Sequence, residues 1–501
     1  MIDYIQIQKG AVGKMAKEAK LVSIIEMQII PEVWQEHILA KKFEDARCVY
    51  NSSLGILLNR YNEIRKTKEF RADQEKIVEY YKNKAGKMPD EIKAIFDKRN
   101  QLYKENQLTQ FGVNTVVLEQ SKYYQKNIPS NVASVTVAEA LWRALNTLIY
   151  GNGKSVTFKR TGSINALASN NKSGIRFIER EDGYFVIFSN IRAHAKTLEI
   201  PVKKPKNIYE DDMMHRNIRI TRVIRKKEGN KYHYYVQLCV DGAPYLKLDN
   251  NGNNVRKFGE GSVGLFLKGN TLYAVSSKGT KKWDLTAGRP DITNLISEID
   301  RKKEEILRLN NPDNYNDDGT PIKGRRKWVR SAQYNELQRK KNEAKRKDRE
   351  SRKIYYNCIA NEILALGTDI HMQKTSFLKD KPKYSEEEKL SNKEYKIKKE
   401  RRKRITDHAP AELFAIINRK LASYTYPCIH EKKYNDDDYF YCHDKNTHDK
   451  SRFTSNLVEL NHNVYNANYY RALCAIYYDN EKKKFDNEMI KKHMGLLKAA
   501  I

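Results

Sequence analysis

Apolar residues recur at helical spacing through most of the first 150 residues. Residues 20–35 (KLVSIIEMQIIPEVWQ) favour a strand that ends at a proline, after which the period changes. Across residues 39–64 the apolar side chains recur at i, i+3 and i+4, the pattern of an amphipathic helix. The same spacing returns over 90–103 and 134–150, and a Gly-Asn-Gly sequence at 151–153 ends it. We predict one strand followed by a helical region.

From residue 154 to 245 the period changes to two, which is typical of strands. Turns rich in Gly, Asn, Asp and Lys separate the predicted strands, and several strands carry Lys and Arg on one face. This pattern predicts a β-barrel that grips a phosphate backbone, or a barrel whose basic face is merely solvated. The predicted strands are SVTFKR, GIRFIER, GYFVIFS, KTLEIPV, NIRITRVIRKKE and YHYYVQLCVD.

The second half of the chain opens with a hairpin and continues mainly as helices. Residues 262–279 (SVGLFLKGNTLYAVSSKG) predict two short strands joined by a tight turn at Lys268-Gly269-Asn270. The elements expected after it are basic helices over 292–309 and 331–366, a charged low-complexity segment over 379–404, a helix over 408–424 with Pro410 in its first turn, a Cys/His-bearing loop over 427–450 and a terminal helix from about Asn463.

The chain is strongly basic. Its 501 residues are enough for two to four domains with an ample core. Lys and Arg number 94 against 63 Asp and Glu, a formal net charge of +31. This excess predicts a polyanionic partner, and the 32 tyrosines are rings that can stack on bases as well as fill a core. We therefore expect nucleic acid as the partner.

Other features of the composition concern the compartment. No apolar run approaches the roughly 20 residues that span a bilayer, and the first 20 residues lack the apolar core of a secretory signal. The six cysteines are scattered, which disfavours a disulfide framework and favours a reducing compartment. We expect no membrane partner and a cytoplasmic location.

Several stretches resemble one protein family, and they occur in family order between about residues 20 and 475. That family is TnpB, the RNA-guided nuclease of certain bacterial transposons, with its descendants, the compact type V CRISPR effectors. The first stretch resembles its N-terminal helix, the middle ones its wedge barrel, and the last the helix between its second and third catalytic motifs. The stretches are FEDARCVYNSSLGILLNRY (43–61), GKSVTFKR with SGIRFIE, NIRITRVIRKKEGNKYHYYVQL, and RRKRITDHAPAELFAIINRKLASYTY (401–426).

The resemblance implies an α+β multidomain chain. A wedge β-barrel with a helical recognition insert would be followed by an RNase H-like (RuvC) α/β domain with a small ribbon-like insertion. The implied divisions are 1–35 (N-terminal segment and first wedge strand), 36–150 (helical recognition domain), 151–257 (wedge barrel), 258–426 (first part of the RuvC-like domain), 427–460 (degenerate zinc-ribbon-like insertion for target nucleic acid) and 461–501 (C-terminal helix and tail).

RuvC chemistry uses three carboxylates, which hold two divalent ions about 3.5–4 Å apart. In this chain Phe266 stands where the resemblance places the aspartate of the first motif. Gln373 stands at the glutamate of the second motif, and Val464 at the aspartate of the third. Since all three positions lack an acid, the resemblance implies a retained fold without nuclease activity and without catalytic magnesium.

Two alternatives stay open. Asp369, Glu412 and Asp284 are candidates for a relocated active site of an active RNA-guided DNA endonuclease. Asp369 is four strand residues from Gln373, however, which is about 13 Å. In the other alternative the chain is a decaying transposon relic that has also lost binding. The regular barrel pattern and the retained positive charge argue against decay.

The inserted ribbon of the family usually carries two Cys-x-x-Cys pairs, which form a tetrahedral zinc site. Here Cys428 and His430 are followed by the adjacent Cys442 and His443, and this spacing is irregular. We expect a degenerate ribbon without metal. A zinc site through these four residues is the alternative.

The resemblance also implies the partners. A guide RNA would lie along the barrel and RuvC surfaces, and base pairing would select a double-stranded DNA target beside a short adjacent motif, for which Tyr50 and Asn51 are candidate readers. Without cleavage, binding would control transcription by occupancy or by recruiting RNA polymerase, a sigma factor or a transposition protein at the bacterial nucleoid. The candidate phosphate contacts are Arg219, Arg222, Arg225, Lys226, Lys227, Lys340, Lys341, Lys345, Arg346, Lys347, Arg349, Arg352 and Lys353.

Overall fold

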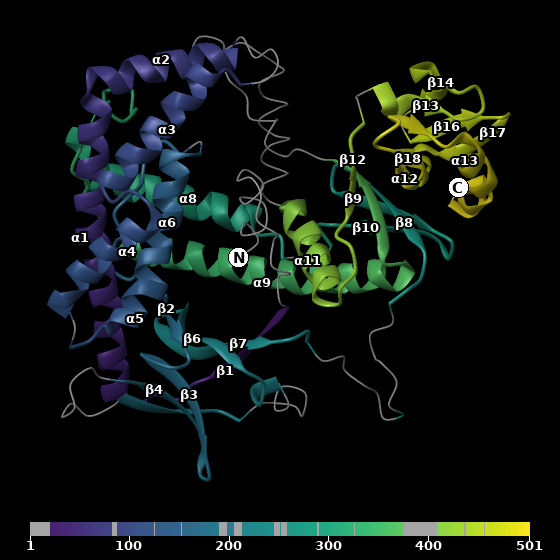
Figure 1. The fold of residues 1–501 in the computed structure, drawn as a ribbon. Coiled ribbons are helices and arrows are strands. Elements are labelled where there is room, and N and C mark those ends of the chain that lie inside the picture. The colour runs from purple at the N-terminus through teal and green to yellow at the C-terminus, as the bar shows by residue number, and fades with distance from the viewer. Residues whose placement is uncertain are drawn as a thin grey trace. The chain divides into compact units, whose positions relative to one another are not determined.

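The computed structural model contains two compact units, an N-terminal unit, Glu18–Tyr245, and a C-terminal unit that begins at Leu246 (Figure 1). None of the helices it describes is long and apolar enough to cross a membrane. The charged segment predicted over 379–404 lies outside the described residues. The structure describes residues 21–82, 88–124, 126–151, 153–189, 198–204, 213–244, 251, 258–287, 290–324, 326–374, 408–434, 437–454 and 456–500.

Helices form the first half of the N-terminal unit, and those predicted over 39–64, 90–103 and 134–150 are confirmed. Helix α1, Val33–Lys66, buries a regular stripe of side chains along its length. Thr67 separates it from α2 with an extended backbone, and the Thr67 hydroxyl accepts the Phe70 N–H at 3.2 Å. The others are α2 (Lys68–Lys82), α3 (Asp90–Glu105), α4 (Gln110–Ser121), the 3₁₀ turn η2 (Lys122–Tyr124), α5 (Ser130–Val132), the π-helical η3 (Ala133–Ala138) and α6 (Glu139–Ile149).

Two antiparallel sheets complete the N-terminal unit. One has the strand order β1-β7-β6-β2 and the other β3-β4-β5, and a single bridge between Ile29 and Val202 joins them. The strands and α1 share one hydrophobic core. Their bounds are β1 Val22–Gln28, β2 Ala166–Asn170, β3 Ile175–Arg180, β4 Gly183–Phe188, β5 Leu198–Val202, β6 Ile218–Glu228 and β7 Lys231–Asp241.

Two predictions for this region are wrong. The described strands form two open sheets where a closed barrel was expected. The stretch SVTFKR, residues 155–160, is not a strand, and at Lys159 the side-chain amide of Asn51 in α1 takes the backbone hydrogen bonds that a neighbouring strand would take. Asn51 accepts the Lys159 N–H at 2.8 Å and donates to its carbonyl at 2.9 Å. The strand that pairs with β6 is instead β2, six residues further on.

A five-stranded sheet forms the centre of the C-terminal unit, and it contains the predicted hairpin. Its order is β10-β9-β8-β11-β12. The hairpin strands β8 and β9 are antiparallel, as are β9 and β10, whereas β11 runs parallel to both β8 and β12. The turn between β8 and β9 contains Gly269 at φ +59°. The bounds are β8 Ser262–Lys268, β9 Thr271–Ser276, β10 Gly279–Asp284, β11 Asp369–Gln373 and β12 His430–Lys432.

Helices cover both faces of this sheet. Val263, Leu265 and Ile370 point to one face and share a core with α9, Ala332–Leu366, and α11, Pro410–Ser423. The other face packs against α12, Ala467–Ile476, and is called the α12 face below. Ser331 caps α9 by accepting the Tyr334 N–H at 3.2 Å, and Pro410 occupies the first turn of α11. The predicted basic helices are confirmed, the first as α8, Thr293–Leu309, which the 3₁₀ turn η4 (Pro312–Asn314) follows.

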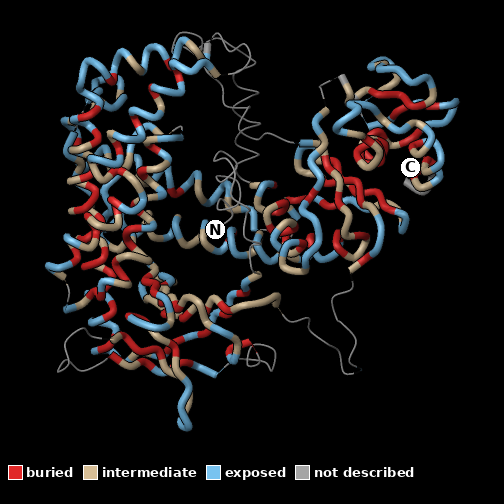
Figure 2. Tube along the Cα trace, viewed as in Figure 1, coloured by how far each residue is buried: buried red, intermediate tan, exposed pale blue. Residues whose placement is uncertain are grey.

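The last part of the chain surrounds α12 with short strands, and buried residues continue through it (Figure 2). The terminal helix begins at Ala467, later than predicted, because residues 463–466 pair with β16 as strand β17. The remaining elements are η5 (Asp437–Phe440), β13 (Tyr441–Cys442), β14 (Thr447–His448), η6 (Lys450–Arg452), β15 (Phe453–Thr454), β16 (Leu457–Leu460), β17 (Asn463–Asn466), β18 (Tyr478–Asp479), β19 (Lys484–Phe485), α13 (Asn487–His493) and η7 (Met494–Ala500).

Candidate functional site

Two of the three positions that the resemblance assigns to catalytic acids lie on the α12 face, on adjacent strands. Phe266 is on β8 and Gln373 ends β11. The parallel register pairs Met372 with Leu265, so the next position along each strand places Gln373 beside Phe266. Sequence order and strand pairing therefore bring these two residues together, and neither carries a charge.

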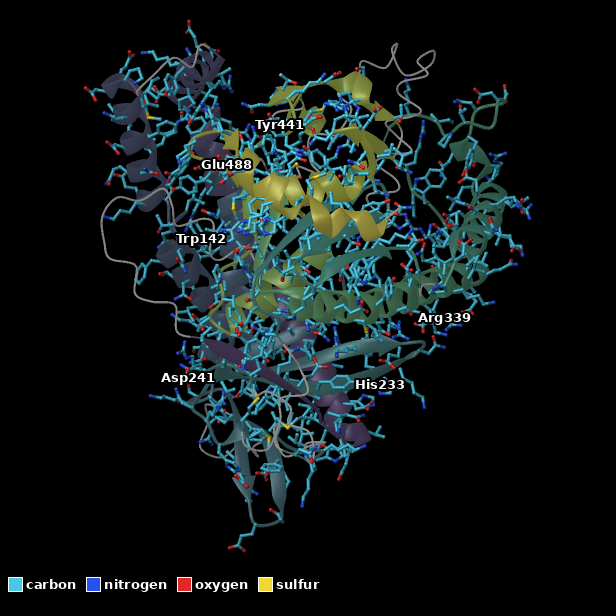
Figure 3. The ribbon with its side chains drawn as sticks, turned by 90° about the vertical axis from the view of Figure 1, so that its right-hand side faces the viewer. Trp142, His233, Asp241, Arg339, Tyr441 and Glu488 are labelled. Atoms are coloured by element: carbon cyan, nitrogen blue, oxygen red, sulfur yellow. The ribbon has the colours of Figure 1, made fainter. Side chains whose placement is uncertain are left out.

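Aromatic side chains fill the space around Phe266, which is 9% exposed. Tyr441 (labelled in Figure 3) and Tyr470 belong to the same core cluster. A cavity of about 10 Å³ remains between them, and a single water molecule needs about 10–15 Å³. The residues at this place do not fit two divalent ions, because the cavity is too small, positions 266 and 373 carry no carboxylate, and Asp438 is the single acid among the residues that line the cavity.

A guanidinium lies within this aromatic cluster. The Arg471 guanidinium carbon of α12 is 5.5 Å from the ring centre of Phe266, 5.7 Å from that of Phe440 and 5.0 Å from that of Phe453. Cation–π attraction holds a cation in such a setting. The sequence analysis missed Arg471; the signal available was a single charged residue in the otherwise uncharged helix ANYYRALCAI.

The third assigned position, Val464, is not part of this cluster. It lies on β17, where its backbone pairs with Glu459, and it is 47% exposed. Helix α12 begins three residues later, and its cap residue Asn466 accepts the Asn468 N–H at 3.0 Å. Of the three positions that the resemblance assigns to catalytic acids, two therefore lie on the α12 face and the third does not.

The three candidates for relocated acids lie on different elements. Glu412 accepts a hydrogen bond from Arg352 at 2.8 Å, between α11 and α9. Asp284 ends β10 near Thr271, the partner of Lys268, whereas Asp369 pairs with Ser262 at the other end of β8. Six strand residues separate those two ends, which is about 20 Å. In the described part of the chain, no group of three His, Cys, Asp or Glu side chains could hold a metal ion.

Asp369 instead joins three strands by hydrogen bonds. Its carboxylate accepts the Ser262 hydroxyl at 2.5 Å and lies 2.8 Å from Nε2 of His371 and 3.3 Å from Nε2 of His430. The two imidazoles are stacked, with ring centres 5.0 Å apart. Although burial raises the pKa of Asp369, the hydrogen bonds from Ser262 and His371 keep it below the usual 3.8. Burial lowers the pKa of His371.

We expect this cluster to make the C-terminal unit sensitive to acid. Because the folded pKa of His371 lies below its ordinary value of 6.5, its contribution to stability is complete above pH 6.5 and falls as the pH drops further. Asp369 acts in the same direction below pH 3.8. His371→Gln removes the first contribution, so the free energy of unfolding in urea should fall less between pH 7.5 and 5 than in the unmodified protein. Equal pH dependence of both proteins would contradict this assignment.

The four candidate zinc ligands divide between two places. Cys428 is exposed and His430 is bound to Asp369 beside β11. Cys442 and His443 are buried beside α12, where the His443 Nδ1 is 3.2 Å from the Tyr470 hydroxyl. Burial raises the pKa of the Cys442 thiol and lowers that of His443. The structure therefore does not bring these four side chains together as one set of metal ligands.

In the N-terminal unit, the two candidate motif readers are engaged with the protein itself. Tyr50 is 2% exposed and belongs to the core, and burial raises its pKa. Base stacking would require its ring to leave that core. Asn51 is fastened to Lys159 by the two hydrogen bonds described above.

Most of the β6 cations are also held by the protein. Arg225 is 9% exposed, lies over the rings of Phe43 and Tyr232 at 4.4 and 4.8 Å, and donates to the Ile164 carbonyl at 2.9 Å. Its position indicates a structural role. The other four have these neighbours: Arg219 pairs with Asp241 (labelled in Figure 3), Arg222 donates to Gln237, Lys226 pairs with Glu26, and Lys227 lies over Tyr232.

Helix α9 separates its cations into two groups. Lys341 binds Asp300, Arg346 binds Glu343 and Glu350, and Arg352 binds Glu412. The hydrogen bonds from Arg346 to Glu343 and Glu350 raise the pKa of Arg346 above its ordinary value. The exposed cations Lys345, Arg349 and Lys353 recur every four residues and form one stripe about 12 Å long. The other exposed cations of the predicted set on this helix are Lys340 and Lys347.

No protein-family model matches the chain, and no curated protein matches it. Among solved structures, the chain is similar to the cryo-EM structure of a CRISPR-Cas12f ternary complex, with 12% sequence identity and a TM-score of 0.28. The similarity covers 90% of this chain and 83% of that chain. Values this low leave the question of function to the residues themselves.

Proposed function

We propose that this chain is an RNA-guided DNA-binding protein whose RuvC-like domain does not cleave. The observation that carries the second half of the proposal is the α12 face. Phe266 and Gln373 stand on neighbouring strands where the resemblance places two acids, and the cavity beside Phe266, lined mainly by aromatic side chains, has about 10 Å³. A two-metal mechanism needs acids and room for both ions and the substrate.

The sheet of the C-terminal unit supports the RNase H-like assignment. Three antiparallel strands followed by two parallel ones, in the order β10-β9-β8-β11-β12, are the arrangement of RNase H-like domains. In such a sheet the first strand lies at the centre, which is the position of β8. The positions that the resemblance assigns to the three catalytic motifs lie on β8, at the end of β11 and on β17, three residues before α12, which is consistent with this assignment.

The charge supports nucleic acid as the ligand. The formal net charge is +31, and the exposed stripe Lys345, Arg349 and Lys353 provides cations that the described carboxylates do not occupy. Such contacts give salt-dependent affinity, while base pairing with a guide supplies sequence selection. Bound without cleavage, the complex would control transcription by occupying DNA or by recruiting a partner protein.

The proposal is tested on the protein purified together with its RNA. That RNA is sequenced, and the complex is incubated with Mg²⁺ and duplex DNA that matches its guide segment beside a randomised adjacent sequence. We expect binding of the matched duplex and intact DNA strands, with a mismatched duplex as the control. Equal binding of the matched and the mismatched duplex would refute the proposal that the RNA selects the DNA target. Cleavage that Asp369→Asn, Asp284→Asn or Glu412→Gln abolishes would establish a relocated active site instead.

A further inference from the structure

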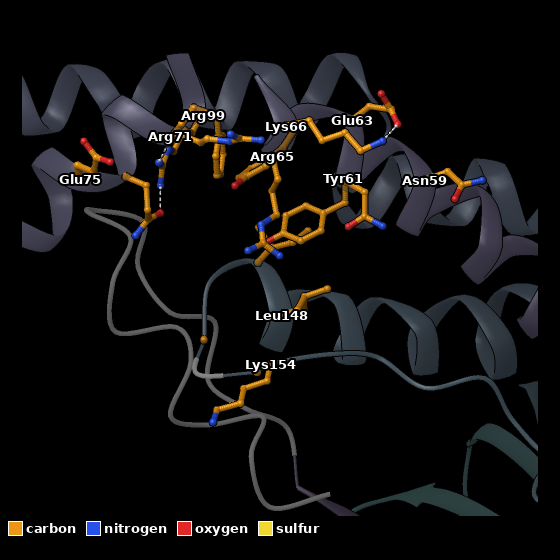
Figure 4. A pocket seen from close by; sticks show the side chains of 17 residues that line it. Asn59, Tyr61, Glu63, Arg65, Lys66, Arg71, Glu75, Arg99, Leu148 and Lys154 are labelled. Carbon is orange, nitrogen blue, oxygen red and sulfur yellow. Dashed lines mark hydrogen bonds and ion pairs between the residues drawn. The ribbon is translucent and has the colours of Figure 1, made fainter. Parts of the chain in front are cut away.

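A cleft of about 1070 Å³ lies within the N-terminal unit, between the α1–α2 corner and the end of α6 (Figure 4). Five basic and two acidic side chains line it. One of the acids, Glu63, is paired with Lys66 at 2.8 Å. Tyr61 and Arg65 point from α1 toward Leu148 of α6, and Lys154 lies on the α6 side. The lining therefore has a clear excess of positive charge.

Arg99 is the buried cation of this cleft. It is 7% exposed, and its guanidinium lies 4.1 Å from the ring centre of Phe70. It donates to the Gln74 side chain at 3.0 Å and to the Phe70 carbonyl at 3.2 Å, both neutral acceptors. Its Nε has no hydrogen-bond partner, and the carboxylate that acts on Arg99, Asp73, does so through charge alone, without a hydrogen bond or ion pair among the described residues. Burial lowers the pKa of Arg99 more than Asp73 raises it, so the buried guanidinium is only partly compensated, which points to an anionic ligand.

The rim of the cleft indicates which part of a nucleic acid would enter. Arg65, Arg71 and Lys154 are exposed there, so they are available to phosphates. The rings of Tyr61 and Tyr103 are 7% and 4% exposed and offer no stacking surface for bases. The volume is enough for a short stretch of one strand. A cleft that offers cations but no exposed ring favours contact with the phosphate backbone of a nucleic acid over contact with its bases.

We propose that this cleft binds the phosphodiester backbone of a single nucleic-acid strand, with a phosphate at Arg99 and neighbouring phosphates at Arg65, Arg71 and Lys154. The inference relies on the proposed function only for the class of ligand. The anion site itself follows from the burial and partners of Arg99.

The first test asks whether the cleft binds anions at all. Sodium tripolyphosphate should raise the melting temperature of the RNA-free protein above that in sodium chloride of equal ionic strength. Arg99→Met should abolish this rise. If that variant does not fold, the triple variant Arg65→Gln, Arg71→Gln, Lys154→Gln replaces it, since all three side chains are exposed. A melting temperature unaffected by tripolyphosphate would overturn the proposal.

The second test uses a fluorescein-labelled 12-nucleotide single-stranded RNA of mixed sequence. Each phosphate contact contributes about 0.7 to the slope of log K against log salt concentration, so the triple variant should lower the slope by about 2. The matched control Lys126→Gln, Lys172→Gln, Lys203→Gln removes the same charge from exposed sites outside the cleft and should change the slope less. If the cleft triple variant and the control triple variant changed the salt slope equally, the proposal that the cleft binds a strand would be overturned. If tripolyphosphate raised the melting temperature but RNA binding did not depend on the cleft, the ligand of the cleft would be a free polyphosphate instead. Cleft-dependent RNA binding without guided DNA binding would refute the proposed function and leave this inference standing.

Discussion

Gly264→Ala should lower the free energy of unfolding of the C-terminal unit by about 3 kcal/mol. A Cβ at Gly264 would collide with the carbonyl oxygen of Ala472 in α12, and it would lie 2.7 Å from the carbonyl carbon of that residue and 2.9 Å from Ile476 Cγ1. A helix backbone cannot rotate out of the way as a side chain can. Helix α12 would have to move away from β8, which opens the core around Phe266. Urea unfolding followed by circular dichroism measures the loss.

Gly495→Ala is the matched control, because a Cβ at that position meets no heavy atom within 4 Å. We expect a change of about 0.5 kcal/mol or less, as for surface substitutions. If both variants were equally stable, α12 would not contact β8 as closely as described. The closed α12 face, on which the proposal of an inactive nuclease rests, would then lose its structural basis.

The local structure of this chain could be predicted well from its sequence. The spacing of apolar residues predicted α1, the basic helices α8 and α9 were predicted within one or two residues of their bounds, and Pro410 was expected in the first turn of α11, where it lies. These features depend on neighbours within one or two turns. The hairpin of β8 and β9 was predicted for the same reason, since its turn residues lie within the stretch itself.

Long-range contacts account for what the sequence did not predict. Arg225 is one of five cations between Arg219 and Lys227, and only its contacts with Phe43 and Ile164 distinguish it as a buried structural residue. Residues 155–160 have an alternating pattern, but the distant Asn51 takes both backbone hydrogen bonds of Lys159 within that stretch. Tyr50 lies on the buried stripe of a helix whose periodicity was recognised, so its core position had a signal in the sequence.

The candidate site was predicted in part. The resemblance placed Phe266 and Gln373, and strand pairing puts them side by side. It could not predict that the cation near Phe266 would be Arg471, because a helix residue 205 positions away reaches β8 only through tertiary packing. Similarly, Cys442 and His443 were grouped with Cys428 by sequence distance, while the fold buries them beside α12.

Phe266→Asp should lower the free energy of unfolding by about 5 kcal/mol, because removing a buried Phe side chain costs about 3–5 kcal/mol and a buried carboxylate adds a desolvation penalty. Arg471, whose guanidinium now lies over the Phe266 ring, would offset part of that penalty by ion pairing. Phe266→Leu keeps most of the apolar volume and should cost less than about 1.5 kcal/mol. Comparing the two in urea separates the effect of charge from that of lost volume.

Phe266→Asp combined with Gln373→Glu and Val464→Asp should not restore cleavage of guided DNA in Mg²⁺. The carboxylates at 266 and 373 would be neighbours on the α12 face, where repulsion between them raises the pKa of one and favours its protonation. Tyr441 and Tyr470 would still fill the space that two ions and a DNA strand require, and Val464 lies exposed on β17. Cleavage by this triple variant would mean that the acids alone are missing and that the aromatic packing yields to metal and substrate. Intact DNA, with guided binding preserved, would support the proposal that the packing of the α12 face prevents cleavage even when acids are present at these positions.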